Sequence, residues 1–300
     1  MKLTTNSTNT TAFGLMLHEC PMSKIRVATK LLFVLFVVCI SKLPAQDTNT
    51  IRIMSYNMQI FGVSKMNKPD VVATLLDIVD DADVIAIQEV RSASPAPVEE
   101  FMARLPLHYD YVLGPREGRS SSKEQFWLIY DTRKIALLGT ENYADPDDAF
   151  ERSPFAVHLR CIGGENAEGT MPFDFIIVNN HLKPGDVHAE IALLPAIGGS
   201  LTETWQEADV IYLGDFNSDG NYYDEAHLGN IFPQAAYTSI IGNEADTTTA
   251  SSSNTYDRII MSNSAKEDWT GNWGVEIIAQ PGVSDHYPVW AEFYTDRDRD

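Results

Sequence analysis

The order of strand and helix signals from residue 51 onward most constrains the fold of this chain. Apolar runs typical of buried strands, such as Ile51–Asn57 and Phe173–Asn179, alternate with helical patterns, one of which opens at Pro69. The other strand-like runs are Asp83–Gln88, Tyr109–Leu113, Phe126–Tyr130, Phe155–Leu159, Val210–Leu213, Tyr256–Met261 and Pro288–Phe293. The other helical patterns lie around 97–105 and 187–207. This alternation predicts a two-layer or multilayer α/β fold.

The composition indicates a packed, acidic protein. Of the 300 residues, 44% are hydrophobic and 21% are charged, which excludes disorder as the main state. The 42 acidic and 22 basic residues give a formal charge of −20, which argues against a broad basic surface that holds nucleic acid. The three cysteines, Cys20, Cys39 and Cys161, form neither a disulfide framework nor a zinc-ligand pattern.

Residues 1–45 have the features of a leader with a secretory signal peptide. The apolar run Leu31–Ile40 follows a stretch with basic residues and is too short to span a bilayer. A start at Met22 would give a signal of ordinary length, so Met22 is the expected true start; a buried core helix is the weaker alternative. We therefore expect a secreted protein, extracellular or periplasmic, with a single domain over residues 46–300. Because the leader holds five basic residues and one acidic residue, its removal changes the formal charge from −20 to −24.

Polar residues of chemically useful types lie at the ends of the predicted strands. Any one of them is more often a turn, cap or structural residue, but open α/β folds gather their sites at such ends. Carboxylate and amide oxygens suit Mg²⁺, and two histidines beside a metal can transfer protons near neutral pH. The set therefore predicts metal-assisted hydrolysis of a phosphate ester. Its members are Asn57, Glu89, His181, Asp215, Asn217, Asp257, Asp285 and His286.

Eight short motifs carry a family resemblance. In chain order they are SYNMQIFG (55–62), IQEVR (87–91), GRSSSKE (118–124), ERSPFAV (151–157), NNHLKP (179–184), GDFN (214–217), TYDRI (255–259) and SDHYPV (284–289). With these motifs the chain resembles the endonuclease/exonuclease/phosphatase superfamily, and within it the deoxyribonuclease I-like branch, over essentially all of residues 51–294. The resemblance implies a four-layer α/β sandwich, in which two packed mixed β-sheets are flanked by helices.

The resemblance also implies roles for individual residues. Glu89 would be the principal ligand of a catalytic Mg²⁺ or Mn²⁺ ion, and the further metal ligands would be Asn57, Asp215 and Asp285. His286, paired with Asp257, would orient or deprotonate the attacking water, and His181, paired with Glu124, would protonate the leaving 3′ oxygen. Which histidine is the base and which the acid stays open, because the two pairs are coupled. The phosphate and DNA would be held by Arg91, Arg152 and Asn217.

Two loops resemble structural calcium sites of the family. Asp246 and Thr248 match ligand positions in a segment that composition alone would assign to a flexible Ser/Thr loop. A second, shortened loop offers Asp145, Asp148 and the carbonyl group of Phe150. The family's inter-loop disulfide is missing here, so we expect loop order to depend on Ca²⁺.

These inferences lead to one function and two alternatives. We expect a secreted, divalent-metal-dependent endonuclease that hydrolyses phosphodiester bonds of DNA with low sequence specificity. The alternative enzyme is another phosphoesterase of the superfamily, of the sphingomyelinase or phosphoinositide phosphatase type, although no membrane-docking segment is recognisable. A catalytically dead binding module is the third possibility, and the complete set of site residues argues against it. The acidic charge predicts transient, salt-sensitive contact with DNA, and we expect a monomer that does not bind membranes.

Overall fold

The computed structural model of this protein describes residues 49–163 and 170–299. The predicted leader, 1–45, and the predicted start at Met22 lie outside the described residues. The described residues belong to one compact unit, Thr48–Asp300. Among them, no helix is both long enough and apolar enough to cross a membrane.

The first of two six-stranded sheets contains the amino-terminal strand. Its strands, in the order in which they pair, are β11 (Trp269–Val275), β12 (Val289–Tyr294), β1 (Thr50–Phe61), β2 (Val84–Val90), β4 (Gln125–Asp131) and β3 (Tyr109–Leu113). The central pair, β1 and β2, is parallel, and β12 and β4 flank it in the antiparallel direction. The carboxyl ends of β1 and β2 therefore lie at the same edge of the sheet.

The second sheet repeats this pairing pattern. Its strands, in order, are β5 (Ile135–Asn142), β6 (Phe155–Cys161), β7 (Asp174–His181), β8 (Val210–Asp215), β10 (Asp257–Ser262) and β9 (Tyr237–Ser239). Again the central pair, β7 and β8, is parallel, and β6 and β10 flank it in the antiparallel direction. In each sheet, therefore, the carboxyl ends of two neighbouring parallel strands lie side by side.

The two sheets pack face to face around one apolar core. Alternate residues of β1 separate its two faces: Ile53 joins the core between the sheets, whereas Met54 joins the cluster under the helices. Because the central strands are covered on both sides, their sequences are almost continuously apolar, which explains the strand signals in the sequence. One polar bridge crosses this core, where Nε2 of Gln88 in β2 donates to Oδ1 of Asn179 in β7 over 2.8 Å.

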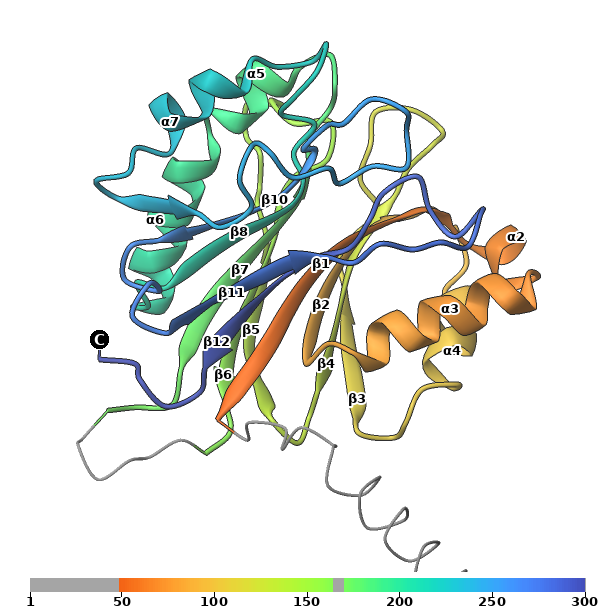
Figure 1. Cartoon of the computed structure of the whole chain (residues 1–300), viewed down its shortest axis with the longest axis horizontal. Helices are drawn as coiled ribbons and strands as arrows, with labels where there is room; N and C mark the ends of the chain where they lie inside the picture. Colours follow the sequence, from red (N-terminus) through yellow and green to blue (C-terminus); the bar gives the residue numbers. More distant parts are fainter. Residues whose placement is uncertain (1–48, 164–169, 300) are drawn as a thin grey trace, which may run out of the picture. The chain divides into compact units, whose positions relative to one another are not determined.

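Helices cover the outer face of each sheet, which completes four layers and confirms the predicted sandwich (Figure 1). The helices on the first sheet are α2 (Val63–Met66), α3 (Pro69–Asp80) and α4 (Ala96–Met102). Those on the second are α5 (Val187–Ile191), α6 (Leu194–Trp205) and α7 (Leu228–Ile231), the last preceded by the 3₁₀ turn η1 (Glu225–His227). The helical pattern predicted around 187–207 is therefore two helices. Pro195 at the start of α6 has no N–H to continue α5, so the chain begins a new helix there.

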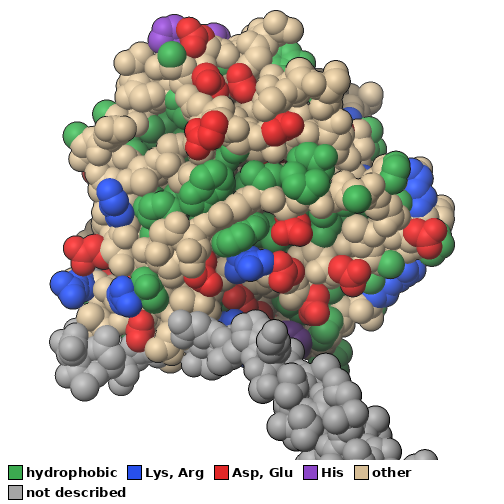
Figure 2. Space-filling model, viewed as in Figure 1, with side chains coloured by type: hydrophobic (Ala, Val, Ile, Leu, Met, Phe, Trp, Pro, Cys, Tyr) green, Lys and Arg blue, Asp and Glu red, His purple; other side chains and the backbone are tan. Residues whose placement is uncertain are grey.

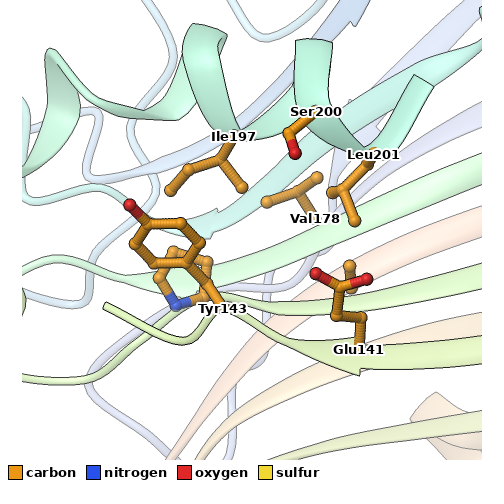
Figure 3. Close-up of a pocket in the computed structure, with 8 residues that line it drawn as sticks. Glu141, Tyr143, Val178, Ile197, Ser200 and Leu201 are labelled. Carbon is orange, nitrogen blue, oxygen red and sulfur yellow. The ribbon is translucent and has the colours of Figure 1, made fainter. Parts of the chain in front are cut away.

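A small pocket lies between α6 and the second sheet (Figure 3). Ile197 and Leu201 of α6 face Val178 of β7 across it. Of the lining residues that the structure describes, Glu141 alone carries a charge. The pocket therefore reflects the packing of one helix on a sheet and offers no group of ionisable side chains.

Candidate active site

The candidate active site lies where neighbouring strands of the second sheet end. His181 at the end of β7 is in register with Asp215 at the end of β8, and Asp257 at the start of β10 is in register with the same Asp215. Three ionisable side chains therefore form one row across the sheet. Gly214 has a φ of 136°, and a β-carbon there would lie 1.8 Å from the carbonyl oxygen of Asn180. Only glycine fits where the strands come this close.

His181 forms a pair with Glu124, which precedes β4 in the first sheet. Nδ1 of His181 lies 2.6 Å from Oε1 of Glu124, and both side chains are buried. Arg152 and Arg91 also contact this carboxylate, with their Nε atoms at 3.0 Å and 3.4 Å. Burial alone would raise the pKa of Glu124, but the charge and hydrogen bond of His181, followed by the two guanidinium charges, lower it to about 2. Glu124 is therefore an anion that orients the His181 ring.

His286 forms the corresponding pair with Asp257. Nδ1 of His286 lies 2.8 Å from Oδ2 of Asp257, which is fully buried. The hydroxyl group of Ser284 accepts from the backbone N–H of His286 and donates to the carbonyl oxygen of Asn57, so the loop is tied to β1. Burial alone would lower the pKa of His286, but the neighbouring carboxylates, first Asp257 and then Asp215, raise it to about 10.

The two imidazole rings converge on one carboxylate oxygen. Oδ2 of Asp215 lies 3.5 Å from Nε2 of His181 and 3.6 Å from Nε2 of His286. Nδ2 of Asn57 lies 3.1 Å from the same oxygen. Two groups that can transfer protons therefore stand on either side of Asp215, each oriented by its own carboxylate. This arrangement can supply a base to one side of a reacting group and an acid to the other.

Oxygen donors gather beside this row, at the ends of β1 and β2. Oε1 of Glu89 lies 3.4 Å from Nδ2 of Asn57, and Oε2 of Glu89 accepts the backbone N–H of Ile60 over 2.9 Å. Glu89 has a φ of 62°, a left-handed conformation that costs of order 1–3 kcal/mol and persists where the surroundings fix it. Asp285 lies at the rim, with its side chain 56% exposed and Oδ1 4.0 Å from Nε2 of His286. Carboxylate and amide oxygens in this density fit a hard divalent cation.

Cationic and amide groups border the same site. Arg152 donates from Nε to the carbonyl oxygen of His181 over 2.9 Å, while its buried Nη2 has no hydrogen-bond partner among the described residues. Asn217 has a φ of 48° and donates from Nδ2 to the carbonyl oxygen of Leu182 over 3.0 Å. Arg91 lies 3.1 Å from Glu89 and donates to the hydroxyl group of Ser122. Of the eleven predicted residues of the catalytic, metal and phosphate sets, ten thus meet at one site, and Asp285 lies at its rim.

Two positioning residues do not stand out in the sequence. The buried ammonium group of Lys65 in α2 donates to the backbone carbonyl groups of Met58 and Val283, which joins the end of β1 to the loop of His286. Burial, more than the nearby charge of a second lysine, lowers the pKa of Lys65 to about 8. The buried carboxylate of Glu190 accepts the backbone N–H groups of Glu151 and Lys183. In the sequence, each of these residues is only a charged side chain among apolar neighbours in a short helical segment.

The predicted calcium loop at Asp246 lies against the site. Thr248 forms an isolated β-bridge with His286, and Oδ1 of Asp246 accepts the backbone N–H groups of Thr248 and Asn254 at 3.3 Å and 3.4 Å. The buried hydroxyl group of Thr248 has no hydrogen-bond partner among the described residues. An orphaned oxygen beside a carboxylate is compatible with a bound cation.

The second predicted calcium loop is arranged differently. The carboxylate of Asp145 accepts the backbone N–H groups of Ala149 and Phe150 at 2.8 Å and 2.9 Å. Asp148 is largely exposed, and Nε of Arg119 lies 3.4 Å from its carboxylate. A guanidinium group therefore already provides positive charge at this loop, so it fits Ca²⁺ less well than the loop at Asp246.

The surface charge agrees with the composition. Figure 2 shows acidic side chains spread across the described part of one face, without a continuous basic surface on it. Basic groups that could meet a phosphate are instead found at the site, in Arg91 and Arg152. A polyanionic ligand would accordingly be held over a small area.

Known proteins resemble this chain in sequence and in fold. The profile described as "Endonuclease/Exonuclease/phosphatase family" matches residues 54–286. "Deoxyribonuclease-1" of Bos taurus is 29% identical over 262 residues, which cover 80% of this chain and 91% of that protein. "Deoxyribonuclease-1-like 1" of Mus musculus is 30% identical over 259 residues, which cover 82% and 81% respectively. The crystal structure of humanized D. rerio TDP2 has a TM-score of 0.59 at 16% identity, covers 82% of this chain and 99% of its own, and shows a shared fold.

Proposed function

We propose that this chain, which belongs to the endonuclease/exonuclease/phosphatase family of phosphoesterases, is a divalent-metal-dependent endonuclease. It would hydrolyse DNA with low sequence specificity. The observation that carries the proposal is the convergence of His181 and His286 on one oxygen of Asp215, each ring backed by its own carboxylate. The relatives named deoxyribonuclease, at 29% and 30% identity, support DNA as the substrate.

A phosphodiester placed beside Asp215 would lie between the two rings. We assign His286 to the attacking water and His181 to the leaving 3′ oxygen, which it would protonate. With its raised pKa, His286 would orient the water in its protonated form and would deprotonate it only in its neutral form. Glu124 and Asp257 would hold the rings and stabilise the imidazolium form of each. Asn217 and the free Nη2 of Arg152 would hold the phosphate oxygens by hydrogen bonds.

The oxygen donors would hold the catalytic cation. Glu89, Asn57 and Asp215 would be ligands of Mg²⁺ or Mn²⁺, and Asp285 would contribute from the rim. Such an ion, when bound, neutralises charge that develops on the phosphate. Because the ion would add positive charge among these carboxylates, a polyanion could bind at this acidic site.

Structural calcium would order the outer loops. Asp246 and Thr248 are the proposed ligands of one ion, supported by the orphaned hydroxyl group of Thr248. Asp145, Asp148 and the carbonyl group of Phe150 are the proposed ligands of a second ion, which would displace Arg119. We further propose secretion through the leader at 1–45 and a single domain over 46–300, as the sequence predicts.

Plasmid nicking tests the proposed function. The purified chain with Mg²⁺ and Ca²⁺ should convert supercoiled plasmid to relaxed circles, and addition of a chelator should stop the reaction. Sphingomyelin vesicles and phosphoinositides, assayed under the same conditions, should be hydrolysed poorly. Cleavage of a lipid phosphodiester while folded, metal-loaded protein leaves the plasmid supercoiled would refute the proposal in favour of another phosphoesterase.

A further inference from the structure

A second cluster of metal-ligating side chains lies outside the active site. Its residues are His158 in β6, Asp174 at the start of β7, and Glu207, which follows α6. The active site uses the opposite end of β7, where His181 lies. We define these three residues as the β6–α6 cluster, and none of them has a role in the proposed hydrolysis.

The geometry of the β6–α6 cluster suits one small cation. Each residue contributes one ligand atom, and these atoms all lie within 4.8 Å of one another. Nε2 of His158 and Oδ1 of Asp174 are 2.6 Å apart, so they would separate to roughly 3 Å to bind one ion at metal–ligand distances near 2 Å. All three residues are buried, with exposed fractions of 6–8%. Only small movements would be needed to form the site.

Neighbouring groups already orient each ligand. Nε of Arg160 donates to Oδ2 of Asp174 over 2.9 Å, which leaves Oδ1 toward His158. Oε1 of Glu207 accepts the backbone N–H of Asp209 over 2.6 Å. The ring of Trp205 stacks on His158 with centroids 5.3 Å apart and planes 20° from parallel. Partners that fix the far side of each ligand are typical of metal sites and favour binding by limiting reorganisation.

The ligand set discriminates between ions. One imidazole nitrogen and two carboxylate oxygens are too few and too mixed for Ca²⁺, which takes six to eight oxygens, whereas Zn²⁺ commonly takes three such ligands and a water. A dication between Asp174 and Glu207 would offset the negative charge of their carboxylates.

We propose that His158, Asp174 and Glu207 form a second metal site, selective for Zn²⁺ or a similar borderline-soft dication, that fastens the end of α6 to β6 and β7. It is independent of the proposed hydrolysis, since its residues lie at the other end of the sheet. Binding requires His158 to present a neutral Nε2, so the proton shared with Asp174 is released when the ion enters.

Zinc titration tests this site. The full chain is stripped with a chelator and titrated with Zn²⁺ in excess Mg²⁺ and Ca²⁺, with stoichiometry, affinity and melting temperature as readouts. His158→Ala should lose one bound Zn²⁺, or bind it at least about 100-fold more weakly, and should lose the zinc-dependent rise in melting temperature. Glu207→Gln should lose zinc binding and the zinc-dependent rise in melting temperature in the same way. This variant serves if His158→Ala fails to fold, because the amide oxygen of the new side chain can still accept the backbone N–H of Asp209.

A matched variant controls for the loss of a histidine. His108 lies 3.9 Å from Asp131 and does not belong to the cluster, so His108→Ala should bind Zn²⁺ as the unmodified chain does. Co²⁺ should give a visible absorption of a four-coordinate site in the control and none in His158→Ala. Equal Zn²⁺ stoichiometry and affinity in the unmodified chain, His158→Ala and Glu207→Gln would overturn the proposal.

Discussion

The two histidine–carboxylate pairs face one another across Asp215, and each joins the two sheets in the opposite sense. In the first pair, His181 extends from the second sheet to Glu124 at the first. In the second, His286 precedes a strand of the first sheet and extends to Asp257 of the second. The active site is therefore built between the sheets, and its geometry depends on how they are packed.

The pairs differ in how their negative charge is compensated. Glu124 has two arginines beside it, whereas the ion pair described for Asp257 is with His286 alone. The guanidinium groups are permanent cations, and their charges add to the charge and hydrogen bond of His181 in keeping Glu124 ionised. Asp257 depends on its histidine, and the pKa of His286 is raised to about 10 in return. The first carboxylate is thus held by several charges, whereas the second is paired with His286 alone among the ion pairs described.

Removal of either ring should have the largest effect. Because each imidazole has its own proton to transfer, His181→Ala and His286→Ala should each slow plasmid nicking by at least about 10³-fold, with metal binding retained. Initial rates of nicking and a calorimetric metal titration measure both quantities. His227→Ala, which removes an exposed histidine, is the control and should nick at the normal rate. A near-normal rate for either site variant would remove that ring from the mechanism.

Replacement of the orienting carboxylate should slow nicking to a different extent in the two pairs. Asp257→Asn should slow nicking by about 10³-fold, because Asp257 provides the hydrogen bond at Nδ1 that orients the His286 ring. Glu124→Gln should cost only about 10²-fold, because Arg152 still binds the carbonyl oxygen of His181. Parallel rate measurements at one pH decide this. Equal losses, or a larger loss for Glu124→Gln, would contradict the assigned difference in charge compensation.

Acid should destabilise the protein through the first pair. The folded pKa of Glu124 is about 2, below its ordinary value of 4.5, so its stabilisation is complete above about pH 4.5 and is lost as the pH falls toward 2. The loss amounts to about 3 kcal/mol. Urea unfolding at pH 6 and pH 3 should show a smaller drop in the free energy of unfolding for Glu124→Gln than for the unmodified chain. An identical drop in both would exclude this ion cluster as a source of acid sensitivity.

Lys65 should matter mainly for the second pair. Lys65→Met leaves the carbonyl groups of Met58 and Val283 without their buried donor, at a cost of about 1–3 kcal/mol each. We expect a lower melting temperature and slower nicking, with partial recovery in Lys65→Arg. The exposed Lys266 supplies the control variant Lys266→Met, which should leave both quantities unchanged.

The smallest effect concerns one arginine of the first pair. Arg91→Ala should weaken DNA binding and reduce the dependence of log Kd on log salt by about one, because one phosphate contact is lost. Fluorescence anisotropy with a labelled duplex at several salt concentrations measures this slope. An unchanged slope would place Arg91 outside the DNA contact surface.

The sequence was most informative where burial is complete. The central strands were found within a few residues, because both faces of each are apolar. The edge strand β3 was also predicted at its bounds, Tyr109–Leu113, although it is only partly buried. Strands β5, β9 and β11 were missed, since they lie at sheet edges and much of each is exposed. These three strands do not show the apolar pattern on which the prediction relied.

The sequence indicated the individual residues of the candidate site but not the contacts between them. The strand ends and the family motifs indicated residues that the structure brings together. That Arg152 and Arg91 share Glu124, and that Lys65 joins two backbone segments, depends on contacts between residues far apart in the chain. Such contacts leave no local periodicity in a sequence. The β6–α6 cluster was hidden for the same reason, because its three residues come from three separate segments.

A double-mutant cycle on the two rings measures whether His181 and His286 act together on one phosphodiester. If His181 and His286 act on one phosphodiester beside Asp215, the double variant His181→Ala/His286→Ala should nick plasmid about as slowly as either single variant, because the residues work as a unit. The unmodified chain should nick readily in Mg²⁺ and Ca²⁺. A double variant whose loss equals the product of the two single losses would contradict the account, as would an unmodified, folded and metal-loaded chain that leaves the plasmid supercoiled.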